Sequence, residues 1–280
     1  MKPKFLYLIL LSLVTLSFQP SSLNDVVELP IKLIDGYGTL PAGFVRLGEP
    51  VTAENPLHDA IRQNLTGIPR TWSNVGVQFI LLEPNQFIFQ SYKQGLLDEN
   101  YFNEFKDRRQ SHFEKRPLSE NRIKCLVYVI HGKDKNGILK HKIDANNNFD
   151  FSDELEYVPP EIDWSKLDSL ANKFALKVKF ESFRNGEIVE LEASVLLLNL
   201  DNGFFGVNIP QHGEAELNGT KILITSQGFT TTDYDSVSIF NSNNINARTN
   251  EEESVIIGAH SYRNLGCDIN KNVLLLRKLD

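Results

Sequence analysis

Regular alternation of apolar and polar residues is the feature that most constrains the fold of this chain. Ten segments alternate in this way and are bounded by Gly, Asn, Asp or Pro. A period of two places successive side chains on opposite faces of a strand, so each segment predicts a β-strand. The predicted strands cover residues 26–34, 75–82, 86–92, 123–130, 174–183, 188–198, 221–225, 236–240, 254–257 and 273–276.

Three Asn-Gly pairs strengthen this expectation. Both central residues of a type I′ hairpin turn take positive φ, which Asn and Gly tolerate. Asn185-Gly186 joins two predicted strands directly, and Asn202-Gly203 and Asn218-Gly219 lie next to others. The second half should therefore form antiparallel sheets of the sandwich or meander type.

Few segments predict helices. Asp98 is a suitable N-cap for a helix over residues 99–109, which has an apolar stripe and three basic residues near its C-terminal end. Residues 56–63 and 165–172 fit short helices. The predicted fold class is thus mainly β with one or two short helices, and an α+β fold is the alternative.

Residues 1–23 are predicted to be a signal peptide. Lys2 and Lys4 give a positive start, residues 5–16 are an apolar run, and residues 17–22 are small and polar apart from Phe18. This order is typical of an export signal, although an uncleaved membrane anchor is the alternative. No second apolar span follows. We expect export to the periplasm, the cell surface or the medium, with no membrane association after cleavage.

The mature chain is predicted to divide near Pro159-Pro160, because two prolines stiffen a link and lack backbone donors. An N-terminal β-rich domain with one helix and an acidic Asn/Asp loop would span residues 24–160. A C-terminal antiparallel β domain would span residues 161–280.

Composition excludes one class of partner. With 41% hydrophobic and 23% charged residues, the 280-residue chain can bury one large core or two smaller ones. Its net charge of −7 is spread along the sequence and leaves no basic cluster. We therefore expect no nucleic-acid partner.

An acidic loop over residues 144–154 carries the clearest chemical signal. Oxygen-bearing side chains occupy alternate positions, as in calcium loops whose carboxylate and amide oxygens converge on a hard cation. The predicted metal ligands are Asp144, Asn146, Asn148, Asp150, Asp153 and Glu154, and the predicted cofactor is Ca²⁺. A polar turn whose Asn and Asp side chains cap their own backbone is the alternative.

Two positions depart from the EF-hand pattern. Phe149 stands where the sharp turn uses Gly, and Leu155 stands where a bidentate Glu closes the shell. A neighbouring acid, Asp150, Asp153, Glu154 or Glu156, would then have to complete the shell.

No catalytic residue is predicted. The six histidines lack zinc-ligand spacing, and the sequence has no G-x-S-x-G, S-x-x-K, P-loop or G-x-G-x-x-G motif. Carboxylates that meet only in the fold would still permit a hydrolase.

Cys125 and Cys267 are the only cysteines. They could remain two free thiols or form one long-range disulfide, and the sequence leaves both alternatives open. The absence of C-x-x-C excludes a thioredoxin-like dithiol centre.

Aromatic residues outside the core would offer a stacking platform for a sugar or a peptide, although core packing is the alternative for each. The candidates are Tyr37, Trp72, Tyr92, Tyr101, Trp164 and Tyr234.

The order of motifs over residues 85–280 resembles the β-rich region that precedes the catalytic domain of secreted bacterial thioredoxin-like proteins. The resemblance is carried by IKCLVYVIHG at 123–132, IDANNNFDFSDE at 143–154, Gly228, Tyr262 and DINKNVLLLRKL at 268–279. The W-C-x-x-C active site of such proteins is absent. The resemblance implies an accessory module without redox chemistry of its own.

Three functions remain open from the sequence. The first is an exported, non-enzymatic binding or accessory module with a calcium-type loop and an unknown protein or glycan partner. The second is a hydrolase of unrecognised class, and the third is a helper of a separate thioredoxin-like redox system.

Overall fold

The computed structural model describes residues 25–47, 57–61, 63–109, 113, 116–200, 204–226, 229–232, 237–242 and 244–280, except for the side chains of 244–247. The predicted signal peptide, the Asn202-Gly203 turn, His112, Gly228 and Tyr234 lie outside the described residues.

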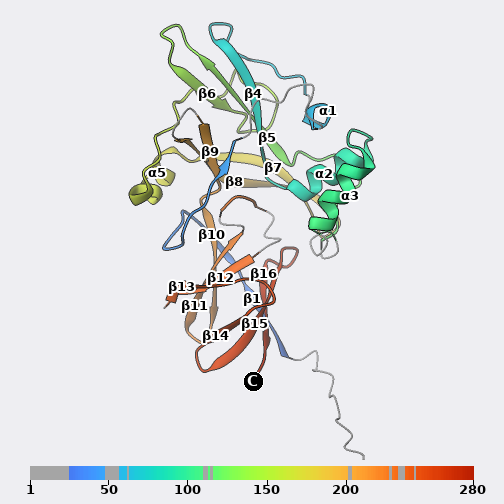
Figure 1. Ribbon diagram of the computed structural model, residues 1–280, viewed down its shortest axis with the longest axis vertical. Coiled ribbons are helices and arrows are strands. Elements are labelled where there is room, and N and C mark those ends of the chain that lie inside the picture. Colours follow the sequence, from blue (N-terminus) through green and yellow to red (C-terminus); the bar gives the residue numbers. More distant parts are fainter. Residues whose placement is uncertain are drawn as a thin grey trace, which may run out of the picture.

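The described residues form four antiparallel sheets (Figure 1). Strands account for 46% of the residues and helices for 16%, which confirms the mainly β prediction. Two sheets in the upper half of Figure 1 have the orders β4-β5-β6 and β3-β9-β8-β7, and two in the lower half have the orders β13-β12-β11-β10-β2 and β1-β16-β15-β14.

The upper strands are β3 (Val45–Arg46), β4 (Ser73–Leu81), β5 (Leu126–Lys133), β6 (Leu139–Ile143), β7 (Leu176–Arg184), β8 (Glu187–Leu200) and β9 (Phe204–Asn208). The lower strands are β1 (Val26–Pro30), β2 (Lys32–Asp35), β10 (Gln211–Leu217), β11 (Thr220–Ser226), β12 (Val237–Asn241), β13 (Asn244–Thr249), β14 (Ser254–Ile257), β15 (His260–Asp268) and β16 (Val273–Lys278). The helices are α1 (His58–Ile61), α2 (Pro84–Lys93), α3 (Glu99–Arg108) and α5 (Leu167–Phe174), and the 3₁₀ turn η2 covers Trp164–Lys166.

Two predicted turns and one predicted cap are confirmed. Asn185 and Gly186 have φ values of 52° and 84° and join β7 to β8 in a hairpin. Asn218-Gly219 does the same for β10 and β11. Asp98 caps α3 by accepting a hydrogen bond from the Tyr101 amide at 2.8 Å.

The strand predicted over residues 86–92 is wrong, because this segment lies in helix α2. Pro84 occupies the first turn, where its missing donor costs nothing. Glu83, Gln86 and Gln90 are all buried, and their spacing of three and four residues places them on one face of the helix. That helical stripe of polar residues was the signal that the sequence analysis missed.

The buried polar stripe of α2 holds the connector that leads into β5. Gln86 accepts from the Ser119 amide at 2.9 Å and donates to the Ser119 carbonyl at 3.1 Å. Gln90 forms the same pair of bonds with Ile123, at 3.0 and 3.1 Å. Each glutamine thus replaces the pairing that a neighbouring strand would supply.

The central strands are buried on both faces, which explains their nearly continuous apolar runs. In β8, Val195 and Leu197 pack with the sheet of β4, β5 and β6, whereas Leu196 and Leu198 face a second cluster that contains Phe229. A third cluster joins helices α1 to α3 to β5, and a fourth lies between the two lower sheets.

The boundary predicted near residue 160 does not coincide with a division between sheets. Strands β1, β2 and β3 precede it in the sequence but pair with β16, β10 and β9, respectively. The sheet β4-β5-β6 is built entirely from residues before the boundary.

Candidate functional site

The acidic loop, residues 144–154, begins where β6 ends and returns to the same strand. His141 and Tyr157 exchange two backbone hydrogen bonds, of 2.9 and 3.0 Å, across the base of the loop. The tip is tied to residue 66 as well, because the Thr66 amide donates to Phe149 and the Phe151 amide donates to Thr66, both at 2.9 Å. The loop is therefore held at its base and near its tip.

Asp144 is fully buried at the start of the loop. Its Oδ1 accepts from the Asn148 amide at 3.0 Å, and its Oδ2 accepts from the Phe149 amide at 3.0 Å. Burial raises the pKa of the Asp144 carboxyl; the two amides lower it, and the charge of Asp153 raises it. This carboxylate therefore fixes the turn of the loop through two backbone amides, while its charged form is disfavoured by burial.

Glu154 and Asp153 close the loop from its far end. Glu154 Oε1 accepts from the Ala145 amide at 2.7 Å, and Asp153 Oδ2 accepts from the side-chain amides of Asn146 and Asn148 at 2.9 and 3.1 Å. Burial raises the pKa of Glu154, and the charges of Asp153 and Asp144 raise it further. Three carboxylates in this loop therefore interact with one another.

The structure brings together five of the six predicted ligands and directs the sixth elsewhere. Asn146 and Asn148 accept backbone hydrogen bonds within the loop, as expected for the polar-turn alternative. The Asp150 carboxylate likewise accepts from the amide two residues later, that of Ser152 at 2.9 Å, and this bond lowers its pKa.

The two departures from the EF-hand pattern have structural counterparts. Phe149 takes a φ of 67°, the left-handed conformation that Gly supplies in calcium loops. Leu155 is 78% exposed, and Glu154, one residue earlier, bonds back to the start of the loop.

Two lysines near the loop were not predicted from the sequence. Lys124 donates to the Asn147 carbonyl at 2.8 Å and lowers the pKa of Asp144. Lys142 donates to the Phe151 carbonyl at 2.6 Å. Lys142 lies on β6 only two residues before Asp144, and this proximity was the available signal.

The loop offers oxygen atoms in a small region, yet its carboxylates are not arranged as a finished metal shell. Within the described part of the chain, no three His, Cys, Asp or Glu side chains form a group suited to a metal ion. An ion here would therefore have to use the Asn oxygens or backbone carbonyls beside the acids.

Both cysteines are free thiols. Cys125 is buried in the connector before β5, and burial raises the pKa of both Cys125 and Cys267 above the ordinary value. The protonated thiol is a poor nucleophile, so these environments do not favour thiol exchange.

Of the described candidate aromatics, only Trp164 is largely exposed, at 63%. Trp72 and Tyr37 are buried, and Tyr92 stacks on Phe102 with ring centroids 4.2 Å apart.

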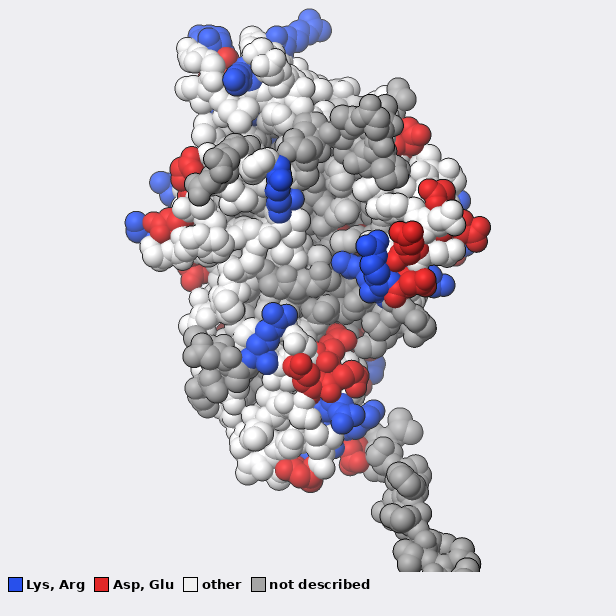
Figure 2. Space-filling model, viewed as in Figure 1, with Lys and Arg blue, Asp and Glu red and all other residues white. Residues whose placement is uncertain are grey.

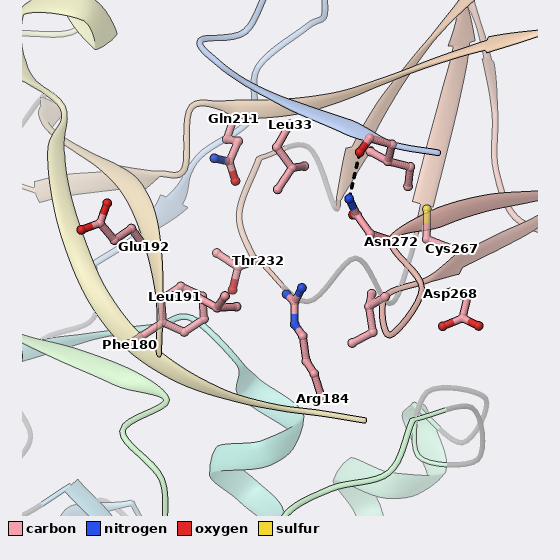
Figure 3. Close-up of a pocket in the computed structure, with 12 residues that line it drawn as sticks. Leu33, Phe180, Arg184, Leu191, Glu192, Gln211, Thr232, Cys267, Asp268 and Asn272 are labelled. Atoms are coloured by element: carbon pink, nitrogen blue, oxygen red, sulfur yellow. Dashed lines mark hydrogen bonds between the residues drawn. The ribbon is translucent and has the colours of Figure 1, made fainter. Parts of the chain in front are cut away.

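A narrow crevice of about 90 Å³ lies where the β7–β8 hairpin meets the lower sheets (Figure 3). Leu33, Phe180 and Leu191 provide much of its apolar wall. Glu192 and Asp268 stand at opposite ends of the view in Figure 3, and the described residues of the lining include no serine and no histidine. This arrangement does not bring a hydrolase pair together.

On the face shown in Figure 2, blue and red side chains are interspersed, without a continuous basic field. Among the described residues, none of the helices has the length and apolar character needed to cross a membrane.

Comparison with protein-family models, with curated proteins and with solved structures finds no match. The resemblance to thioredoxin-like proteins therefore stays a prediction.

Proposed function

We propose that this chain is an exported, non-enzymatic binding or accessory module whose acidic loop takes up a calcium ion. The observation that carries the calcium proposal is that one tied loop gathers Asp144, Asp153 and Glu154 on its own amides, where their like charges repel one another. A divalent cation beside these carboxylates would offset that repulsion and stabilise the folded state. Export rests on the signal-like pattern of residues 1–23.

A non-enzymatic role is supported by the chemistry of the described residues. The thiols are protonated, and the charged residues of the crevice stand apart. The calcium ion would be structural, since it would tie the start of the loop to its end.

Thermal unfolding with and without calcium tests the proposal. Extracellular modules bind calcium with dissociation constants of about 10⁻⁴ to 10⁻³ M. At about 10 mM calcium, binding of this strength stabilises the folded state by about 1.4 to 2.7 kcal/mol. For a chain of this size, we expect the melting temperature to rise by about 2 to 5 °C.

Asp153→Asn is the matched variant, because Asp153 is exposed and an asparagine oxygen can still accept the bonds from Asn146 and Asn148. Asp107→Asn, on the exposed side of α3, is the control for loss of one negative charge. We expect the calcium shift to fall in the first variant and to persist in the second. An equal response to calcium in both variants would place the calcium effect outside the loop, and no response in the unmodified chain would show that the loop is held by its own hydrogen bonds alone; either result would refute the calcium proposal.

A further inference from the structure

A second site lies at the side of the molecule that carries α5, away from the acidic loop in the sequence. Residues 37–42, which follow β2, and residues 164–169, which form η2 and the start of α5, line a hollow of about 620 Å³. Figure 1 shows α5 at one flank of the upper sheets. A hollow of this size is within the range for small-ligand sites, which is about 300 to 1,000 Å³.

Trp164 forms one wall of the hollow and is the most exposed aromatic side chain in the described part of the chain, at 63%. Phe44 contacts it edge-on, with ring centroids 5.3 Å apart and an interplanar angle of 74°. The indole is therefore supported from one side and open on much of its surface. A large apolar face held in this way favours a ligand that stacks on it.

Polar groups with unused hydrogen-bonding capacity share the hollow with Trp164. Asp168 Oδ1 accepts from the Tyr37 amide at 2.9 Å, which fixes the carboxylate, while Oδ2 has no partner among the described residues. The hydroxyls of Thr39 and Ser169 are exposed and likewise unpaired within the described chain. The charge of Lys166 is engaged by Asp163 at 3.0 Å.

We propose that this hollow binds a neutral glycan, with one sugar ring stacked on Trp164 and its hydroxyls bonded to Asp168, Thr39 and Ser169. A pyranose ring presents C–H groups on one face and hydroxyls around its edge, which matches an indole beside a fixed carboxylate and two hydroxyls. Asp168 would repel an acidic sugar.

The two tryptophans allow a direct assay. Trp72 is buried, so the variant Trp72→Phe leaves Trp164 as the sole indole of the chain. The probes are hexasaccharides of β-1,4-glucose, β-1,4-N-acetylglucosamine and α-1,4-glucose at millimolar concentrations. We expect at least one of them to give a saturable change in Trp164 emission. Calorimetric titration of the unmodified chain provides the same measurement if Trp72→Phe does not fold.

Three variants assign the binding site. We expect Trp164→Ala to weaken binding about tenfold or more and Asp168→Asn to weaken it less. Phe204→Ala removes another exposed aromatic ring, outside the hollow, and should leave binding unchanged. No saturable response to any of the three sugars, or binding that survives in Trp164→Ala, would overturn the proposal, as would displacement of the sugars by unrelated peptides. The proposal does not depend on calcium in the acidic loop.

Discussion

Replacement of Gln86 by leucine tests whether the buried polar stripe of α2 holds the connector before β5. Gln86 is 1% exposed and forms two hydrogen bonds with the backbone of Ser119, which is 2% exposed. In Gln86→Leu, both backbone groups would lose their partner while still buried. Each such loss costs about 1 to 3 kcal/mol, so the pair costs about 2 to 6 kcal/mol.

Part of this cost is offset by the leucine, because burial of its side chain contributes about 1.5 to 3 kcal/mol. Matching lower with lower and upper with upper bounds, the net loss in the free energy of unfolding should be about 0.5 to 3 kcal/mol. Urea denaturation followed by circular dichroism measures it, and a slope of about 3 kcal/mol/M predicts a midpoint lower by about 0.2 to 1 M.

Gln94→Leu is the control, because Gln94 is exposed at the end of the same helix and uses only its backbone in the cap. Hydrogen exchange adds a local readout, since the Ser119 amide should lose protection in Gln86→Leu and retain it in Gln94→Leu. Equal midpoints and equal protection in the two variants would refute the reasoning about the connector.

Two further perturbations follow from the surroundings of the acidic loop. His141 is fully buried, and this burial, with a smaller effect from His131, lowers its pKa from 6.5 to about 3. The free energy of unfolding should therefore fall as pH drops below about 6.5, because the unfolded chain takes up the proton first. The loss reaches about 3 kcal/mol near pH 4. Denaturation at pH 7 and pH 4 should show this loss reduced in His141→Phe but not in His260→Phe, a control at a histidine whose side chain is 44% exposed; equal pH dependence in both variants would exclude His141 as the source. Gly67 has a φ of +67°, and a Cβ there would overlap the Ser152 amide, whereas Gly137 has a φ of +77° with nothing within 4 Å. Gly67→Ala should lower the free energy of unfolding by about 1 to 3 kcal/mol more than Gly137→Ala in the same denaturation assay, because both alanines would be strained in the left-handed conformation but only the first would displace the loop. Similar losses in the two variants would contradict the close approach of residue 67 to the Ser152 amide.

Local patterns predicted the local structure well. Alternation located most of the central strands, Asn185-Gly186 predicted its hairpin, and Asp98 predicted the start of α3, because each depends on neighbouring residues alone. Strand β10 was missed because Gly213 interrupts its pattern. A Cβ at Gly213 would lie 2.8 Å from Ile31 Cγ2. The need for glycine at this position therefore comes from a contact with a residue that is remote in the sequence.

The candidate site shows the same division. The sequence identified five side chains that do meet in the acidic loop, because their spacing is local. The bond from the Ser152 amide to Asp150 spans only two residues and agrees with the polar-turn alternative, whereas no local pattern indicated that Lys124 would approach from another segment. That approach depends on pairing that no single segment encodes.

The pairing of β1 with β16 has a consequence for the order of folding. The earliest described strand finds its partner only in residues 273–278, so it stays unpaired until these residues have been synthesised. Closing so long a loop adds little to the thermodynamic cost, since that cost grows with the logarithm of length, but it delays completion of the lower sheets. A change that slows the arrival of the final strand should therefore reduce the yield of correctly folded chains more than the durability of those already formed.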